Sequence, residues 1–145
     1  MKRVFPGLLL LLPAFAILSS QAPHDPLVSK CLQSIGPNAK YLKDFRIQLG
    51  ESSAGETFRY KASMFLWKDT KYRFTLCTSD NSKGQLILTV KDKDNNNIAS
   101  SVDINSGTFY TYIDLICNKS EVYQIWFDFT KGHSGSGVVI VSMLQ

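Results

Sequence analysis

The sequence has few of the residues from which metal and hydrolytic centres are built. It holds two histidines and three cysteines in 145 residues, and no two cysteines stand in a CxxC pair. Structural zinc sites use such pairs or clustered histidines, so the sequence argues against a zinc protein. His133 lies in "KGHSGSG", where no serine has glycine at both flanking second positions, as a nucleophile elbow requires. We therefore expect that the protein is not an enzyme; a hydrolase ranks third, after the two binding functions described at the end of this section.

Clustered positive charge is also missing. The net charge of +4 falls to +2 once Lys2 and Arg3 are removed with the leader described below, and the other basic residues are scattered among acids. Proteins that bind nucleic acid present clustered cations to the phosphates. The composition therefore excludes nucleic acid as an expected partner.

Only one long apolar run is present, and it stands at the start of the chain. "MKR" precedes "VFPGLLLLLPAFAIL", and the small residues "SSQA" follow it. This order is typical of a cleavable export signal, and the run is too short and too often interrupted by proline to span a bilayer. We expect cleavage after Ser20 and an exported protein in the periplasm, at the cell surface or outside the cell, without a membrane span. The remaining 125 residues suffice for one domain.

A short helix should follow the signal. Asp25 can cap it, Pro26 suits its first turn, and Gly36 followed by proline ends it. Apolar residues recur between these points at helical spacing, so one face should dock on the rest of the protein. We assign residues 21–44 to this N-terminal helix and a connector, and residues 45–145 to the β-sandwich on which the helix docks.

From residue 45 onward the hydrophobic period changes from helical to alternating. About eight short segments of this kind are separated by clusters of Gly, Asn, Asp and Ser. The segments are "FRIQL", "TFRYKASMFLW", "KYRFTLC", "QLILTV", "NIASSVDI", "TFYTYIDLIC", "EVYQIWFDFT" and "SGVVIVSML". The pattern predicts an all-β fold, an antiparallel β-sandwich or jelly roll of about eight strands with one short N-terminal helix.

The three cysteines leave two interpretations open. Cys77 and Cys117 each close an apolar strand, so they can meet at the ends of a sheet and form a disulfide. Alternatively, both of them and Cys31 are buried thiols, because free cysteine behaves as a small hydrophobic residue.

An acidic segment resembles a calcium loop in its spacing. Asp92, Asp94 and Asn96 alternate, and Asp103 follows them, but glycine is missing from the sixth position and both flanks read as strands. We expect a hairpin turn here, because Asn and Asp tolerate turn geometry. No cofactor is expected, and Ca²⁺ is kept only as a weak alternative.

The segment around Trp126 carries the candidate binding site. If its strand neighbours the preceding one, six side chains form a single aromatic and polar surface: Tyr110, Tyr112, Asp114, Gln124, Trp126 and Asp128. Such surfaces hold sugar rings by stacking and by hydrogen bonds. The other interpretation is that the N-terminal helix covers this face, because an exposed apolar patch favours association.

The order of the strands resembles the bacterial pre-peptidase C-terminal-like domains and related small jelly-roll modules. Over about sixty residues, the matching positions are Tyr72, Phe74, Leu86, Leu88, Val90, Asp92, Tyr123 and Ile125. The resemblance implies a non-catalytic module that accompanies secreted enzymes, although this chain adds a capped helix and cysteines. The chain is also similar to small exported envelope proteins of Bacteroidota. We therefore expect an accessory or protein-interaction module with an envelope or secreted protein partner, the alternative being a carbohydrate-binding module.

Overall fold

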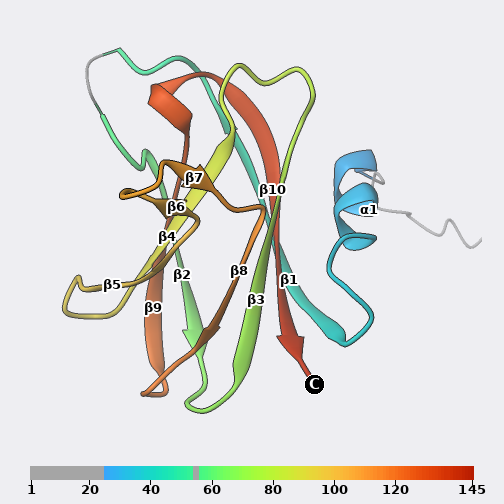
Figure 1. The fold of residues 1–145 in the computed structure, drawn as a ribbon, viewed down its shortest axis with the longest axis vertical. Helices are drawn as coiled ribbons and strands as arrows, with labels where there is room; N and C mark the ends of the chain where they lie inside the picture. The colour runs from blue at the N-terminus through green and yellow to red at the C-terminus, as the bar shows by residue number, and fades with distance from the viewer. Residues whose placement is uncertain (1–24, 54–55) are drawn as a thin grey trace, which may run out of the picture.

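The computed structural model describes residues 25–53 and 56–145, which form a β-sandwich with one short helix (Figure 1). The predicted signal peptide, residues 1–20, lies outside the described residues. Within the described part of the chain, no helix is long and apolar enough to cross a membrane.

The predicted helix is present as α1, Pro26–Leu32. Its first turn is capped as expected, because the Leu27 amide donates a 2.9 Å hydrogen bond to the Asp25 carboxylate. The helix ends four residues before Gly36, the predicted stop. Ile35, beyond the helix end, is nevertheless buried and continues the docked apolar face.

Two four-stranded antiparallel sheets form the sandwich. Sheet A has the order β1-β10-β3-β8 and sheet B the order β2-β9-β4-β5. Their bounds are β1 Ala39–Leu49, β10 Gly135–Leu144, β3 Lys71–Thr78, β8 Tyr112–Ile116, β2 Tyr60–Leu66, β9 Glu121–Phe129, β4 Leu86–Lys91 and β5 Asn97–Ser100. The pairs β1–β10, β2–β9, β3–β8 and β4–β5 are those of one long hairpin rolled into a barrel-like sandwich. This is the predicted jelly roll.

The described residues contain ten strands rather than eight, because two predicted strands are each divided. β6, Val102–Asp103, and β7, Thr108–Phe109, form a small ribbon between the two sheets' strands β5 and β8. The chain leaves sheet B at Ser101, which is buried and whose hydroxyl accepts a hydrogen bond from the Leu88 amide. The Ser101 hydroxyl takes the place of a backbone carbonyl as the hydrogen-bond acceptor of the Leu88 amide. Such a substitution leaves no trace in the hydrophobic period, so the division into β5 and β6 was not predicted.

The first strand begins at Ala39, so the predicted boundary at residue 45 is wrong. The register of β1 against β10 shifts between Tyr41 and Lys43, and the strand before that point is largely exposed. A bulge interrupts the alternation of buried and exposed side chains, which is the signal by which strands are recognised. The connector after α1 is correspondingly shorter than expected.

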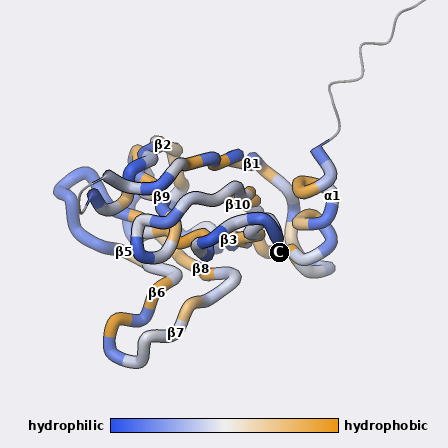
Figure 2. Tube along the Cα trace, turned by 90° about the horizontal axis from the view of Figure 1, so that it is seen from above, coloured by the Kyte–Doolittle hydropathy of each residue, from blue (hydrophilic) through white to orange (hydrophobic). Residues whose placement is uncertain are grey.

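The inward faces of the two sheets supply the core. Its fully buried side chains include Phe74, Leu88, Ile125 and Phe127. A second, smaller apolar cluster lies on the outside of sheet A, where α1 packs; it comprises Cys31, Ile35, Val138 and Ile140, with Leu27, Val28, Ala39 and Cys77 around them. Figure 2 shows α1 beside β1, β10 and β3, on the side away from β2 and β9. The helix therefore covers the outer face of sheet A over β10 and β3, while no helix packs on the outer face of sheet B within the described residues.

Candidate functional site

The outer face of sheet B carries the residues around Trp126. Along β9, Tyr123, Ile125 and Phe127 are buried in the core, whereas Gln124 and Trp126 lie on the opposite, outer face and are partly exposed. The predicted alternation is confirmed. The interpretation that α1 covers Trp126 is wrong, because the helix packs on sheet A, where β10 offers two buried apolar side chains on its outer face.

Two lysines flank the indole of Trp126. The Lys61 ammonium from β2 lies 4.0 Å from the ring centroid, and the Lys91 ammonium from β4 lies 4.3 Å from it. Such cation–π contacts contribute about 0.5–1 kcal/mol each at exposed sites. Among the described residues, no carboxylate forms an ion pair with either lysine. The centre of this face is therefore aromatic and locally cationic.

The indole nitrogen of Trp126 has no hydrogen-bond partner. The Nε1 atom is buried, and no acceptor of the described chain lies within hydrogen-bonding geometry. An unpaired buried donor costs about 1–3 kcal/mol relative to a paired one. Beside it, the Ser63 hydroxyl donates a 3.3 Å hydrogen bond to the Gln124 side-chain oxygen. The indole N–H of Trp126 is therefore a hydrogen-bond donor that no described group uses, next to Ser63 and Gln124, which bond to each other.

Asp128 continues the same face but is buried, with an exposed fraction of 3%. Its Oδ1 accepts hydrogen bonds from Arg59 Nε at 3.0 Å and Arg59 Nη2 at 2.9 Å, and also from the Phe129 amide at 2.7 Å. The Arg59 side chain is 10% exposed and also donates hydrogen bonds to the backbone carbonyls of Gly50 and His133. This ion pair joins the start of β2, the end of β9 and the loops on either side.

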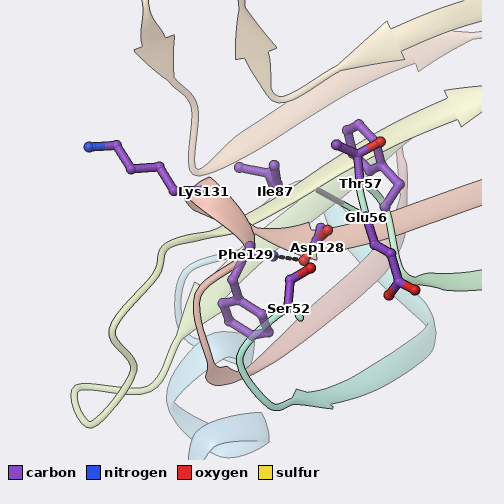
Figure 3. Close-up of a pocket in the computed structure, with 9 residues that line it drawn as sticks. Ser52, Glu56, Thr57, Ile87, Asp128, Phe129 and Lys131 are labelled. Atoms are coloured by element: carbon purple, nitrogen blue, oxygen red, sulfur yellow. Dashed lines mark hydrogen bonds between the residues drawn. The ribbon is translucent and has the colours of Figure 1, made fainter. Parts of the chain in front are cut away.

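A cavity of about 250 Å³ opens beside this ion pair, at the end of sheet B (Figure 3). It is lined by Ser52, Glu56, Thr57, Phe58, Ile87, Asp128, Phe129, Lys131 and Gly132. The hydroxyl of Ser52 is buried there, and it has no hydrogen-bond partner within residues 25–53 and 56–145. Phe58 and Lys131 adopt φ of 50° and 57°, values that bulky residues rarely take. Figure 3 shows Lys131 extending away from Ser52 and Asp128.

Glu51 ties the two loops at this end together. Its carboxylate accepts a 2.9 Å hydrogen bond from the Ser134 amide and lies 3.3 Å from His133 Nδ1. The hydrogen bond from the Ser134 backbone, followed by the one from His133, lowers the pKa of Glu51 to about 2. An ionised Glu51 carboxylate therefore links the loop before β2 to the loop after β9, next to the cavity.

An exposed apolar patch occupies the other end of sheet B's outer face. Phe65 and Val122 are paired across β2 and β9, and their exposed fractions are 45% and 49%. Trp67 is 63% exposed, and its ring meets that of Phe65 edge-on at a centroid distance of 5.0 Å. We call Phe65, Trp67 and Val122 the apolar patch. The alternation of "TFRYKASMFLW" places Phe65 and Trp67 on the outer side of the strand. The sequence therefore indicated that these two residues are exposed, but the predicted site did not include them.

The structure does not bring the six predicted surface residues together. Tyr112 and Asp114 lie on β8, which pairs with β3 in sheet A, and Tyr110 lies just before that strand. Arg73 bonds Asp114 at 2.7 Å and lies 4.5 Å from the Tyr112 ring. The hydrogen bond from Arg73 lowers the pKa of Asp114. A contiguous surface with Trp126 was predicted wrongly, because strands adjacent in sequence here belong to different sheets.

The predicted calcium ligands serve two separate turns. Asp92 Oδ1 accepts hydrogen bonds from the amides of Asp94 and Asn96, both at 2.9 Å, in the hairpin between β4 and β5. The Asn96 backbone hydrogen bond is the largest contribution that lowers the pKa of Asp92. Asp103 caps the β6–β7 hairpin through the Asn105 amide. The hydrogen bonds to Asp92 confirm the expected hairpin turn, whereas Asp103 belongs to a second turn. Within the described residues, no three acidic, cysteine or histidine side chains gather as a metal site.

The predicted pairing of Cys77 with Cys117 is wrong. Cys77 forms a disulfide with Cys31, 46 residues earlier, and Cys117 is a buried free thiol. The physical reason is the strand period: Cys77 lies on the outer, helix-facing side of β3, whereas Cys117 belongs to the core between the sheets. Burial raises the pKa of Cys117. The interpretation of three free thiols is also excluded.

Comparison with known proteins adds no relative. No family model matches the sequence, and no curated protein matches it either. The resemblance to pre-peptidase C-terminal-like domains therefore remains a prediction made from strand order alone.

Proposed function

We propose that this protein is a non-enzymatic binding module that holds a partner protein on the outer face of sheet B. The observation that carries the proposal is the apolar patch of Phe65, Trp67 and Val122, beside the lysine-flanked Trp126. Aromatic side chains surrounded by polar ones are the residues that contribute most to protein interfaces. The opposite outer face is partly covered, because α1 packs on β10. Its exposed apolar side chains, Tyr112 and Ile116, lie on the edge strand β8 beside the Arg73–Asp114 ion pair.

The surroundings of Trp126 favour a protein over a neutral sugar. A pyranose ring binds by stacking on a free aromatic face, but here the ammonium groups of Lys61 and Lys91 lie over the indole. A neutral sugar would have to displace at least one of these cations without replacing its charge interaction. The carbohydrate-binding alternative therefore requires a rearrangement that a protein partner, with the apolar patch as its anchor, does not require.

The disulfide supports the proposal that the module acts outside the cytoplasm. Disulfides such as Cys31–Cys77 persist in oxidising compartments, in agreement with the export signal predicted from the first twenty residues. We propose an accessory role in the bacterial envelope or in the secreted fraction, as an interaction module.

Site-specific photo-crosslinking in the cells that produce the protein tests this proposal. A benzophenone amino acid is placed at Phe65, and the matched control is the same residue at Tyr41, which has a similar exposed fraction and lies on β1 at the edge of sheet A. We expect one dominant protein adduct from position 65 and none from position 41. The adduct from position 65 should be lost when Trp67→Ser and Val122→Ser are added.

Two results would contradict the proposal. Equal adduct patterns from positions 65 and 41 would show that the outer face of sheet B has no preference for a partner. Retention of the purified protein on a neutral polysaccharide, abolished by Trp126→Ala, would favour the carbohydrate-binding alternative instead.

A further inference from the structure

We propose that Lys61, Trp126 and Lys91 form a binding site for carboxylate groups of an acidic polypeptide. This inference rests on the proposed function, because it specifies the chemistry of the partner that the outer face of sheet B would hold. We call these three residues the carboxylate site.

The first argument is the charge of the site. Lys61 and Lys91 come from the two strands on either side of β9, and both ammonium groups lie close to one indole. The residues paired with them across the sheet are Trp126 and Gln124, which carry no charge. The nearest acid on this face of β9, Asp128, is engaged by Arg59. Two like charges held together without a counter-charge attract an anion.

The second argument is the unused donor at the centre. Trp126 Nε1 is buried and lacks a partner among the described residues, and an indole nitrogen can only donate. A carboxylate has two oxygens with about four acceptor positions, enough for the indole and both ammonium groups at once. An incoming carboxylate pairs with the two ammonium groups as they move, so the charge interaction that they lose at the indole is replaced and the carboxylate can reach the indole nitrogen between them.

The third argument selects a polypeptide over an acidic glycan. Lys61 and Phe65 lie four residues apart on β2, which is about 13 Å along a strand. The apolar patch is therefore within reach of a ligand whose carboxylate occupies the site. A polypeptide carries carboxylates and apolar side chains at such spacings, whereas an acidic polysaccharide has no large apolar groups to cover Phe65 and Trp67.

The test uses poly-L-glutamate as the probe and the Trp67→Phe variant as the protein, so that Trp126 is its one tryptophan. Dissociation constants are measured by isothermal titration calorimetry at about 150 mM salt, where charges more than about 8 Å apart are largely screened. Tryptophan emission, recorded in parallel, shows whether the probe reaches Trp126. Polygalacturonate, which carries the same group on a sugar backbone, is the second probe.

Lys61→Gln with Lys91→Gln is the test variant, and Lys40→Gln with Lys43→Gln on β1 is the matched control. Both pairs change the net charge equally, and the control also removes a lysine that lies over an aromatic ring. We expect poly-L-glutamate to bind saturably and to change the emission of Trp126. Its affinity should fall at least about tenfold in the test variant, as for loss of a charge-assisted hydrogen bond, and stay within about twofold in the control.

Three results would overturn the inference. These are no saturable binding of poly-L-glutamate, an equal loss of affinity in the test and control variants, or tighter binding of polygalacturonate than of poly-L-glutamate. The proposed function is judged separately, because the photo-crosslink at Phe65 uses no acidic probe. If that crosslink persists while poly-L-glutamate fails to bind, the carboxylate site alone is refuted.

Discussion

Removal of the Cys31–Cys77 disulfide should destabilise the sandwich by about 4 kcal/mol. The bond closes a chain segment across a separation of 46 residues. Loop-closure entropy for that length amounts to roughly 13 cal/mol/K, which corresponds to about 4 kcal/mol at 25 °C. Because the bond joins α1 to β3, its loss should also loosen the helix from sheet A.

Urea unfolding followed by tryptophan fluorescence measures this free energy. The test variant is Cys31→Ala with Cys77→Ala, and the control is Cys117→Ala, which removes the free thiol and leaves the disulfide intact. We expect the control to cost no more than about 2 kcal/mol, the scale of a small buried side chain. A thiol count on the denatured, unreduced protein should give one, and three after reduction.

Opposite results would refute the reasoning. If Cys117→Ala destabilised the protein as much as the double variant did, and its denatured, unreduced form showed two free thiols, the cross-link would have to involve Cys117. Peptide mapping that found Cys77 joined to Cys117 would have the same meaning, and it would require the two faces of β3 to be exchanged.

Three further predictions concern the end of the sandwich near the cavity. Asp128→Ala and Arg59→Met should each lower the free energy of unfolding, measured in urea, by about 3 kcal/mol, because either change leaves the partner's charge unpaired. The double variant should lower it by no more than either single variant does. Gly135→Ala should lower the free energy of unfolding by about 1–3 kcal/mol, because the added methyl group would lie 2.4 Å from the ring of Phe129. The control, Gly50→Ala, places its methyl group in free space and should change the free energy of unfolding by less than about 0.5 kcal/mol. The pKa of Glu51 is lowered from 4.5 to about 2, so its contribution to stability is present above pH 4.5 and lost as the pH falls toward 2. Glu51→Gln should therefore make the melting temperature less dependent on pH over that range. An unchanged slope of melting temperature against pH would contradict this assignment.

Much of the fold followed from period-two patterning. The alternation along "EVYQIWFDFT" predicted which side chains enter the core, and burial of Tyr123, Ile125, Phe127 and Phe129 confirms it. The helix start was predictable because capping is local: it needs only an acceptor side chain such as Asp25 near the first amides. The jelly-roll architecture followed from the number and spacing of the strands.

The candidate site was predicted only in part. Trp126 and Gln124 do share an outer face, but Lys61, Lys91 and the apolar patch come from strands that are distant in sequence. Tyr112 and Asp114 were placed beside them because their strand precedes β9 in the chain. In a jelly roll, consecutive strands often cross between sheets, so neighbourhood in sequence does not give neighbourhood in space.

The sequence by itself determined what depends on local periods and local capping: strand faces, the helix cap and the turn at Asp92. The tertiary structure alone decided which sheet each strand joins, because pairing between distant strands leaves no periodic trace. It thereby decided that α1 docks on sheet A, that Cys31 meets Cys77, and that the outer face around Trp126 stays open. The proposed binding function depends on that last outcome.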